Sequence, residues 1–318
     1  MKEKKRKYDV LVVGELNVDL ILNDIASLPQ IGKEIIAGNM TLTLGSSSAI
    51  FASNISTLGV KTAFAGMIGI DSFGELVLKS LEKKNVNTDY IIRSNKDKTG
   101  ITIVLNYDED RAMVTHPGAM EIFSDKDVTD EMLQQAGHLH VSSVFLQKEL
   151  KKNIVKLFRR AKKLGLTTSL DVQWDPDEKW DLDFNELLPL VDVFMPNKKE
   201  MEAITGYENI NGALEAIKNY TNIVAVKMGN KGSLGFKNGK KIEVPPFLNT
   251  QVVDAIGAGD SFNAGFISQF IKNKSLESCL KFGNLMGAIN TTANGGTGAF
   301  KDFETIRITA KEKFNFDI

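Results

Sequence analysis

The stretch from Val253 to Phe262 carries the strongest chemical signal in the sequence. Gly257 and Gly259 let the backbone turn tightly, so nearby amides can converge at the start of the helix that follows. The amides concerned are those of Ala258, Gly259 and Asp260. They would form an anion hole suited to phosphate. A carboxylate beside phosphate is unfavourable unless it takes a proton from an attacking hydroxyl, so Asp260 is the candidate general base. The position also suits an ordinary acidic residue in the first turn of a helix.

Asn197 and Glu200 form a second candidate cluster, directly after the apolar run 191–195. Three positions apart on a helix, they would share one face, where both could address a hydrated magnesium ion or a phosphate. The end of a strand in a parallel sheet is the usual place for such a site. The same two residues also fit a capping box, with Asn197 as N-cap and Glu200 at N3, and the two interpretations are compatible.

A third cluster lies near the N-terminus, where Gly14 precedes Asn17 and Asp19. Asn17 and Asp19 would point to one side of an extended segment, and an amide beside a carboxylate can grip vicinal hydroxyl groups. A second polar segment follows at 45–48, Gly-Ser-Ser-Ser. These residues equally suit an Asx turn and a serine-rich helix cap, so the substrate-binding interpretation needs the wider context.

Composition excludes several classes of protein. Lys plus Arg (39) nearly balance Asp plus Glu (40), so no overall field attracts nucleic acid or an anionic membrane. The single cysteine, Cys279, cannot form an intramolecular disulfide, which favours a cytoplasmic location. We expect no signal sequence and no transmembrane segment, because no apolar run approaches the roughly 18 residues needed to span a bilayer.

Between these clusters, apolar strands alternate with helices. We expect strands at 8–13, 62–65, 138–142, 167–171, 191–195, 222–227, 233–236 and 241–244. We expect helices at 47–58, 71–84, 149–164, 198–205 and 213–220, after residue 257, and from 276 to about 293. Such alternation predicts a Rossmann-like α/β fold, in which a mostly parallel sheet carries helices on both faces.

Two strand-like segments interrupt the alternation, at about 15–44 and 98–116. The second reads as a hairpin, with strands 101–106 and 112–115 around the acidic turn 108–110. We expect both segments to form a small separate β-sheet that acts as a lid. Exposed edges of such a sheet seek partners, so a homodimer formed through the lid is expected.

In this order, the three clusters resemble the ribokinase-like family of carbohydrate kinases, also called the phosphofructokinase B family. The resemblance covers essentially the whole chain. The family signature Asp-Thr-x-Gly-Ala-Gly-Asp is matched by residues 254–260, Asp-Ala-Ile-Gly-Ala-Gly-Asp. Its Asn-x-x-Glu motif is matched by Asn197 and Glu200, and its Gly-x-x-Asn-x-Asp strand by Gly14, Asn17 and Asp19.

This resemblance implies one kinase domain over residues 1–318 that phosphorylates a hydroxyl of a sugar or sugar-like molecule with ATP and Mg²⁺. Asp260 would be the base, and the amides of Gly257, Ala258, Gly259 and Asp260 the anion hole. The substrate would contact Asn17, Asp19, Gly45, Ser46, Ser47 and Asp260. ATP would contact Asn197, Lys227, Gly229, Gly232, Gly257, Gly259 and Asn284. Glu200 would hold Mg²⁺ through water, and Asp254 would lie near a monovalent cation such as K⁺.

Two residues depart from the family pattern. Ile50 replaces a substrate-binding Asn, and Ala255 replaces the signature Thr. A nucleoside kinase or a sugar-acid (ketodeoxygluconate) kinase on the same fold stays open, and Tyr107 and Arg111 would distinguish them. A nucleotide- or sugar-binding regulator without turnover also stays open, although an intact Asp260 argues for activity.

Four further polar residues carry weaker signals. Gln147 and Gln173 each follow a strand, where the substrate loops of α/β folds gather, and are therefore candidate pocket residues. His138 and His140 alternate on a strand with no acidic residue near them in sequence, so we expect them to pack in the protein rather than to bind a metal.

No Gly-x-Gly-x-x-Gly follows the first strand, which disfavours a nicotinamide-dependent oxidoreductase.

Overall fold

The computed structural model describes residues 6–27, 29–107 and 110–318, and it contains two β-sheets. The larger sheet has the strand order β13-β12-β11-β10-β9-β8-β1-β4-β5. Its strands are β1 Tyr8–Val13, β4 Thr62–Gly69, β5 Asn87–Ser94, β8 Ala136–Ser142, β9 Thr167–Asp171, β10 Val193–Phe194, β11 Ile223–Lys227, β12 Ser233–Lys237 and β13 Lys240–Val244. All neighbours pair in parallel except β11 with β12 and β12 with β13. The predicted mostly parallel sheet is thereby confirmed.

Helices cover both faces of this sheet. They are α1 Ser47–Thr57, α2 Ser72–Lys83, α3 Asp130–Gln134, α4 Lys148–Lys152, α5 Ile154–Lys163, α6 Phe184–Leu187, α7 Lys198–Thr205, α8 Ile210–Ile217, α9 Ala258–Phe270, α10 Leu276–Asn290 and α11 Phe303–Phe314. Strand β1 shows why both faces must be covered. Leu11 and Val13 pack in one apolar cluster with α5 and α8, whereas Val10 and Val12 pack in the other with α1 and α9. A strand that is apolar on both sides is typical of a central parallel strand.

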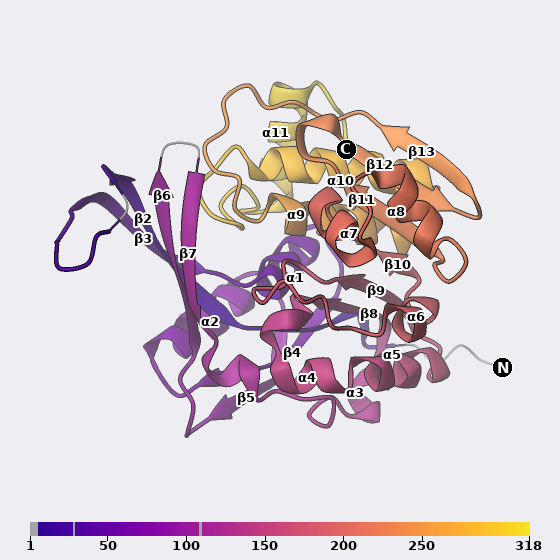
Figure 1. The fold of residues 1–318 in the computed structure, drawn as a ribbon, viewed down its shortest axis with the longest axis horizontal. Coiled ribbons are helices and arrows are strands. Elements are labelled where there is room, and N and C mark those ends of the chain that lie inside the picture. Colours follow the sequence, from indigo (N-terminus) through magenta and orange to yellow (C-terminus); the bar gives the residue numbers. More distant parts are fainter. Residues whose placement is uncertain (1–5, 28, 108–109) are drawn as a thin grey trace.

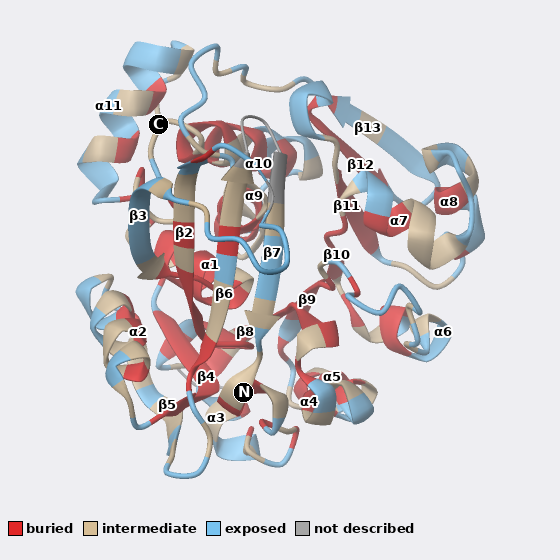
Figure 2. Cartoon of the chain, turned by 60° about the vertical axis from the view of Figure 1, so that its left-hand side comes forward, coloured by how far each residue is buried: buried red, intermediate tan, exposed pale blue. Residues whose placement is uncertain are grey.

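The smaller sheet forms the lid predicted from the two interrupting segments. It comprises β2 Asn17–Ile25, β3 Ala37–Leu44, β6 Gly100–Tyr107 and β7 Asp110–His116, in the order β3-β2-β6-β7. The pairing is antiparallel except between β2 and β6. Figure 1 shows this sheet standing to one side of the larger one. In Figure 2, β4 of the larger sheet is coloured mostly as buried, whereas much of β3 and β7 is coloured as exposed.

Several predicted elements need correction. Sequence analysis missed the edge strand β5, because its apolar run, residues 90–92, is only three residues long and lies between polar residues that are half or fully exposed. Helix α11 was also missed. The helix predicted over 149–164 is interrupted at Asn153, giving α4 and α5. Helix α8 begins three residues before the predicted start because Asn209 caps it. Strand β10 is limited to two residues. Within the described ranges, no helix has the length and apolarity needed to cross a membrane.

Candidate active site

The start of α9 has the backbone shape expected of an anion-binding turn. Gly257 is the N-cap with a left-handed φ of 75°, and a Cβ there would lie 2.5 Å from Cα of Gly296, so this position needs glycine. Ser261 donates its N–H to the Gly257 carbonyl (2.8 Å) and closes the first turn. The N–H groups earlier in the helix therefore have no intrahelical acceptor.

One of the predicted anion-hole amides already has a partner. The N–H of Ala258 donates to the carbonyl of Ala255 at 3.3 Å. The amides of Gly259 and Asp260 lie in the first turn and are oriented along the helix axis, as anion binding requires. The side chain of Lys227 adds a positive charge here, because its Nζ would lie 3.7 Å from a Cβ placed on Gly259. The geometry therefore removes the Ala258 amide from the set of amides that sequence analysis predicted for the anion hole.

Asp260 is buried at this turn, and only 6% of it is exposed. Its Oδ1 accepts a hydrogen bond from Nε2 of Gln173 (3.1 Å). Burial raises the pKa of Asp260 well above its ordinary value, and the negative charge of Asp171 raises it further, while Lys227 and the Ser47 hydroxyl act in the opposite direction. A carboxyl with a raised pKa is a stronger proton acceptor when it is ionised, which suits a general base.

Asp171 is a residue of this site that sequence analysis did not select. It ends β9, is fully buried, and accepts hydrogen bonds from Nζ of Lys227 (2.5 Å) and Nδ2 of Asn263 (2.5 Å). Burial alone lowers the pKa of Lys227, but the carboxylates of Asp171 and Glu200 outweigh it and raise the pKa. Lys227 is therefore a cation among buried acids. The only signal in the sequence was that Asp171 ends a predicted strand.

Asn197 and Glu200 form the predicted capping box of α7. Glu200 N–H donates to Asn197 Oδ1 (2.9 Å), and Asn197 N–H donates to Glu200 Oε2 (2.8 Å). The backbone at Asn197 also forms a parallel bridge with Lys227. Burial raises the pKa of Glu200 to about 7, with the charge of Asp171 acting in the same direction. The capping interpretation is confirmed, and the cap places this carboxyl among the buried acids.

This raised pKa predicts a pH-dependent stability difference between the wild type and Glu200→Gln. A glutamine at N3 preserves the capping box. Because the folded pKa (about 7) exceeds the unfolded value of 4.5, Glu200 contributes its full stability below pH 4.5 and loses it as pH rises through 7. Relative to the wild type, Glu200→Gln should therefore become more stable as pH rises from about 5 to 8. Its free energy of unfolding, minus that of the wild type, should increase by up to about 3 kcal/mol over this range.

Denaturant unfolding of both proteins across this pH range measures the difference directly. The exposed Glu215, which pairs with Lys218 on the surface of α8, provides the matched control as Glu215→Gln. The control should show no comparable trend. A difference between Glu200→Gln and the wild type that is constant with pH would contradict the prediction.

The predicted substrate residues gather where the lid meets the larger sheet. Asn17 donates Nδ2 to Asp19 Oδ1 (3.1 Å) and to Oγ1 of Thr102 on β6 (2.9 Å). A Cβ on Gly45 would lie 2.2 Å from Asp19 Oδ1, so glycine lets the backbone approach this carboxylate. Ser46 is the N-cap of α1 and accepts the N–H of Ala49. The structure therefore brings the N-terminal cluster and the Gly-Ser segment together.

Ile50 lies one turn further along α1 and is buried. A Cβ on Gly296 would lie 2.3 Å from Ile50 Cδ1, and one on Gly257 would lie 3.1 Å from Ile50 Cγ2. The side chain thus packs against the anion-hole turn. Where the family pattern has a polar amide, this chain has an apolar contact between α1 and the start of α9.

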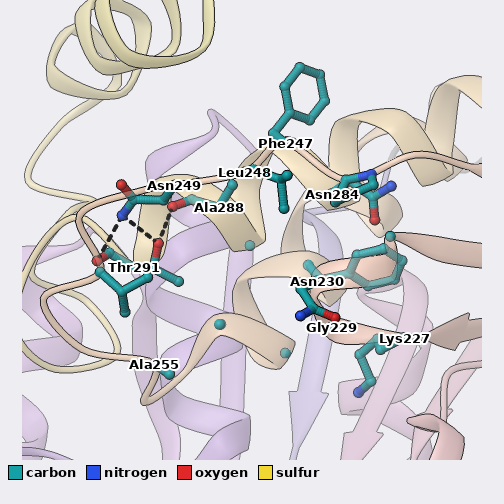
Figure 3. Close-up of a pocket in the computed structure, with 17 residues that line it drawn as sticks. Lys227, Gly229, Asn230, Phe247, Leu248, Asn249, Ala255, Asn284, Ala288 and Thr291 are labelled. Atoms are coloured by element: carbon teal, nitrogen blue, oxygen red, sulfur yellow. Dashed lines mark hydrogen bonds between the residues drawn. The ribbon is translucent and has the colours of Figure 1, made fainter. Parts of the chain in front are cut away.

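A cavity of about 340 Å³ opens beside the anion-hole turn, a size suited to a small ligand. Figure 3 shows Lys227 and Gly229 on one side of it, with Asn249 and Thr291 across from them. Its lining residues are Lys227, Gly229, Asn230, Gly232, Pro246, Phe247, Leu248, Asn249, Val252, Ala255, Ala258, Gly259, Phe262, Asn284, Gly287, Ala288 and Thr291. Five of the seven predicted ATP residues are therefore brought to one cavity.

The remaining two predicted ATP residues, Asn197 and Gly257, are not among the lining residues. Asn284 forms part of the wall and donates Nδ2 to the carbonyls of Val244 (3.1 Å) and Pro245 (3.0 Å). These bonds fix the loop after β13 against α10. The cavity is mostly apolar with a few polar groups, which is typical of a site for a small molecule.

Asp254 connects two loops next to the anion-hole turn. Its Oδ1 accepts the N–H of Ile256 (2.8 Å), and its Oδ2 accepts the N–H of Gly295 (2.8 Å). In the described ranges no three His, Cys, Asp or Glu side chains lie close enough to hold a metal ion by themselves. Any ion here would therefore take other ligands, such as backbone carbonyls, water or phosphate.

The weaker candidates are also placed. Gln173 contacts the candidate base, as described above, whereas Gln147 donates Nε2 to the carbonyls of Ser142 (2.9 Å) and Ser143 (3.2 Å). His138 and His140 are buried, and each bonds to Ser169 at 2.7 Å, so they pack in the sheet as expected. The side chains of Tyr107 and Arg111 lie outside the described part of the chain.

Comparison with known proteins decides the family. The model of the pfkB family carbohydrate kinases matches residues 7–302. The chain belongs to the pfkB family of carbohydrate kinases. This kinase is 31% identical to the ribokinase of Arabidopsis thaliana over 314 residues, 93% of this chain and 79% of that protein. It is 26% identical to the 2-dehydro-3-deoxygluconokinase of Bacillus subtilis over 308 residues, 91% of each chain.

A solved structure supports the same assignment. The kinase superposes with a TM-score of 0.80 on Arabidopsis thaliana ribokinase complexed with ribose and ATP, at 29% identity, covering 94% of this chain and 97% of that one. The fold and the family predicted from the sequence are therefore confirmed. The kinase activity follows from the family.

Proposed function

We propose that this kinase transfers the γ-phosphoryl group of ATP to a hydroxyl group of a sugar or sugar-like molecule. We further propose that residues 1–318 act as one kinase domain and that the protein works in the cytoplasm. Its partners would be small-molecule substrates, with no nucleic acid and no membrane among them. The single observation that carries the catalytic assignment is the position of Asp260. This buried carboxyl lies at the start of α9, next to the anion-hole turn and close to the cavity.

In the proposed reaction, the Asp260 carboxylate accepts the proton of the attacking hydroxyl while Gln173 fixes its orientation. The amides of Gly259 and Asp260 stabilise charge on the transferred phosphoryl group. Lys227 adds a positive charge at the same turn, beside the cavity that would hold ATP. Phosphoryl transfer needs mainly positioning and charge stabilisation, which these groups supply.

Magnesium fits the residues near the phosphate end of the cavity. When bound, Mg²⁺ would neutralise charge on the phosphates, and it usually keeps several water ligands. The buried Glu200 carboxyl already accepts two hydrogen bonds from Asn197, one at each oxygen. Each carboxyl oxygen can accept a second one, so Glu200 could also accept hydrogen bonds from the water ligands of Mg²⁺. We propose that K⁺ binds near Asp254, since this carboxylate connects the two loops at residues 256 and 295.

The sugar would lie between the lid and the start of α1. Asn17, Asp19 and the backbone at Gly45 would contact its hydroxyl groups, and Ser46 and Ser47 would extend this polar surface. A coupled assay of ADP release with ribose, fructose, ketodeoxygluconate, inositol and nucleosides tests the proposal. We expect one of these to stimulate ADP release strongly. ATP binding without any substrate-dependent ADP release would favour a regulator instead.

The outer face of the lid supports the proposed homodimer. Leu42, Leu20, Ile103 and Val114 lie directly opposite one another across all four strands. Leu42, Ile103 and Val114 are 40%, 37% and 67% exposed, and a contiguous apolar surface of this kind is typical of an interface. A second copy of the chain offers the same surface, as a two-fold interface requires.

We therefore expect the wild type to be a dimer and Val114→Lys combined with Leu42→Lys to be a monomer, as measured by light scattering coupled to size-exclusion chromatography. Met113 is exposed on the same strand but on the opposite face, so Met113→Lys is the matched control and should stay dimeric. A monomeric wild type, or a double variant that remains dimeric, would contradict the prediction.

A further inference from the structure

Ser46 has an unusual backbone conformation at the start of α1. Its φ is 70° and its ψ is 118°, a region that residues with side chains rarely adopt. Such a conformation persists only where the surroundings hold it. Ser46 Oγ donates to the carbonyl of Glu15 (2.5 Å) and accepts the N–H of Ala49 (3.0 Å). The turn that presents Gly45 to Asp19 is therefore held by the loop after β1.

The side chain of Glu15 makes a second connection to the same turn. The carboxyl is almost fully buried, with 1% exposed, and it accepts the N–H of Ser48 at 3.1 Å and the hydroxyl of Ser48. The Ser48 hydroxyl also lies 2.9 Å from Oγ of Ser142, at the end of β8. Ser48 sits directly over Gly14, where a Cβ would lie 1.9 Å from its Oγ. The loop after β1, the start of α1 and the end of β8 therefore meet at the Ser48 hydroxyl.

We infer that Glu15 is a positioning residue for the sugar, whose ionised carboxylate holds the turn at residues 45–47 against Asn17 and Asp19. This inference rests on the proposed function, because it assigns the sugar to that turn. Glu15 does not need to touch the sugar. It fixes the first turn of α1 from outside the helix, in addition to the N-cap that Ser46 provides.

The charge of Glu15 gives this role a distinctive pH dependence. Burial raises the pKa of Glu15 to about 7, although the hydrogen bonds from Ser48 lower it. Above neutral pH the carboxylate accepts two charge-assisted hydrogen bonds, which are stronger than neutral ones. Below neutral pH the protonated carboxyl must donate one of its bonds. The hydrogen bonds from Ser48 lower the pKa of Glu15, which means that they are stronger to the ionised carboxylate, so the hold that they give the turn weakens as pH falls. Burial has the opposite sign and acts on the fold as a whole, as it does at Glu200, so the turn itself must be measured rather than global stability.

Five other titratable groups belong to the elements around Glu15. They are Asp19 and Asp24 on β2, His138 and His140 on β8, and Asp260 on α9. Burial keeps the pKa of His140 well below its ordinary value, so it stays neutral. The charge of Glu15 raises the pKa of Asp260, so losing that charge acts on the base as well as on the turn. A measurement must therefore separate KM for the sugar from kcat.

Glu15→Gln provides this separation, because the amide resembles the protonated carboxyl in shape and charge. At about pH 8 we expect KM for the sugar to be about tenfold higher in Glu15→Gln than in the wild type, and at about pH 6 the two should agree within about twofold. KM for ATP should stay within about twofold at both pH values, since Glu15 is not among the residues that line the ATP cavity.

A second measurement needs no substrate, so it stays decisive even if the proposed function fails. Amide hydrogen exchange in the peptide covering residues 45–50 should be faster in Glu15→Gln than in the wild type at about pH 8, and equal at about pH 6. Glu186→Gln, which removes an exposed carboxylate paired with Arg159, is the matched control and should show neither effect.

The outcomes are distinguishable. A wild type that phosphorylates no sugar would contradict the proposed function, and hydrogen exchange would still test the role of Glu15. A wild type that turns over, with a ratio of KM values that does not change with pH, would overturn the inference. Unchanged exchange at residues 45–50 would overturn it as well.

Discussion

Replacing Asp260 with Asn should lower kcat by about 10²- to 10⁴-fold, the range that a positioned general base contributes. The amide keeps the size of the side chain and its contact with Gln173, but it cannot accept the proton of the sugar hydroxyl. KM for ATP should change little, because the cavity and the turn stay in place. Steady-state kinetics with a sugar that the wild type phosphorylates measures both quantities.

The pH profile gives an independent check on the same residue. Because the pKa of Asp260 is raised, the wild-type kcat/KM should fall as pH decreases, at a pH above the ordinary aspartate range near 4. Asn263→Asp is not a suitable control, since Asn263 contacts Asp171 within the site. Exposed Asp181→Asn, which removes a surface partner of Lys151, is the appropriate one. A kcat for Asp260→Asn within about threefold of the wild type would rule out the base.

Lys227→Met should cause the second large effect, because it removes the cation from among the buried acids. Asp171 is fully buried and loses its ion pair, and Glu200 and Asp260 lose a compensating charge. Breaking a buried pair on one side typically costs about 3–5 kcal/mol of stability. We expect a loss of this size in the free energy of unfolding, and weaker ATP binding, because Lys227 also lines the cavity.

The partner substitution distinguishes this explanation from general damage to the core. Combining Lys227→Met with Asp171→Asn removes both charges and should recover part of the lost stability. Lys162→Met breaks a half-exposed pair with Asp192 and should cost no more than about 1 kcal/mol. Denaturant unfolding of the four proteins measures these differences. A double variant less stable than Lys227→Met alone would contradict the account.

The sequence predicted the parts of the site that lie close together along the chain. The turn at 257–260 and the capping box of Asn197 and Glu200 are local patterns, and their backbone shapes follow from glycine and helix-cap chemistry. The pair of Asn17 and Asp19 is equally local. The order of these patterns then indicated the family, and with it the two sheets.

Other residues of the site could not be predicted, because their contacts join elements far apart in the sequence. Asp171, Lys227 and Asn263 meet only because the fold brings the ends of β9 and β11, which lie on either side of β10, together with α9. The same holds for Glu15, whose hydrogen bonds reach residue 48 across a strand pair and a loop. A buried acid has no distinctive local spacing, so only the fold shows which acids lack water and share one cation.

The most direct test of the account follows the phosphoryl group itself. The kinase is incubated with ATP labelled in the γ-phosphate and a sugar that stimulates ADP release, beside Asp260→Asn. We predict that the label appears in a sugar phosphate, one for each ADP formed, and that the variant transfers it at least about a hundredfold more slowly. Label released as inorganic phosphate, or transfer by Asp260→Asn at the wild-type rate, would contradict the account.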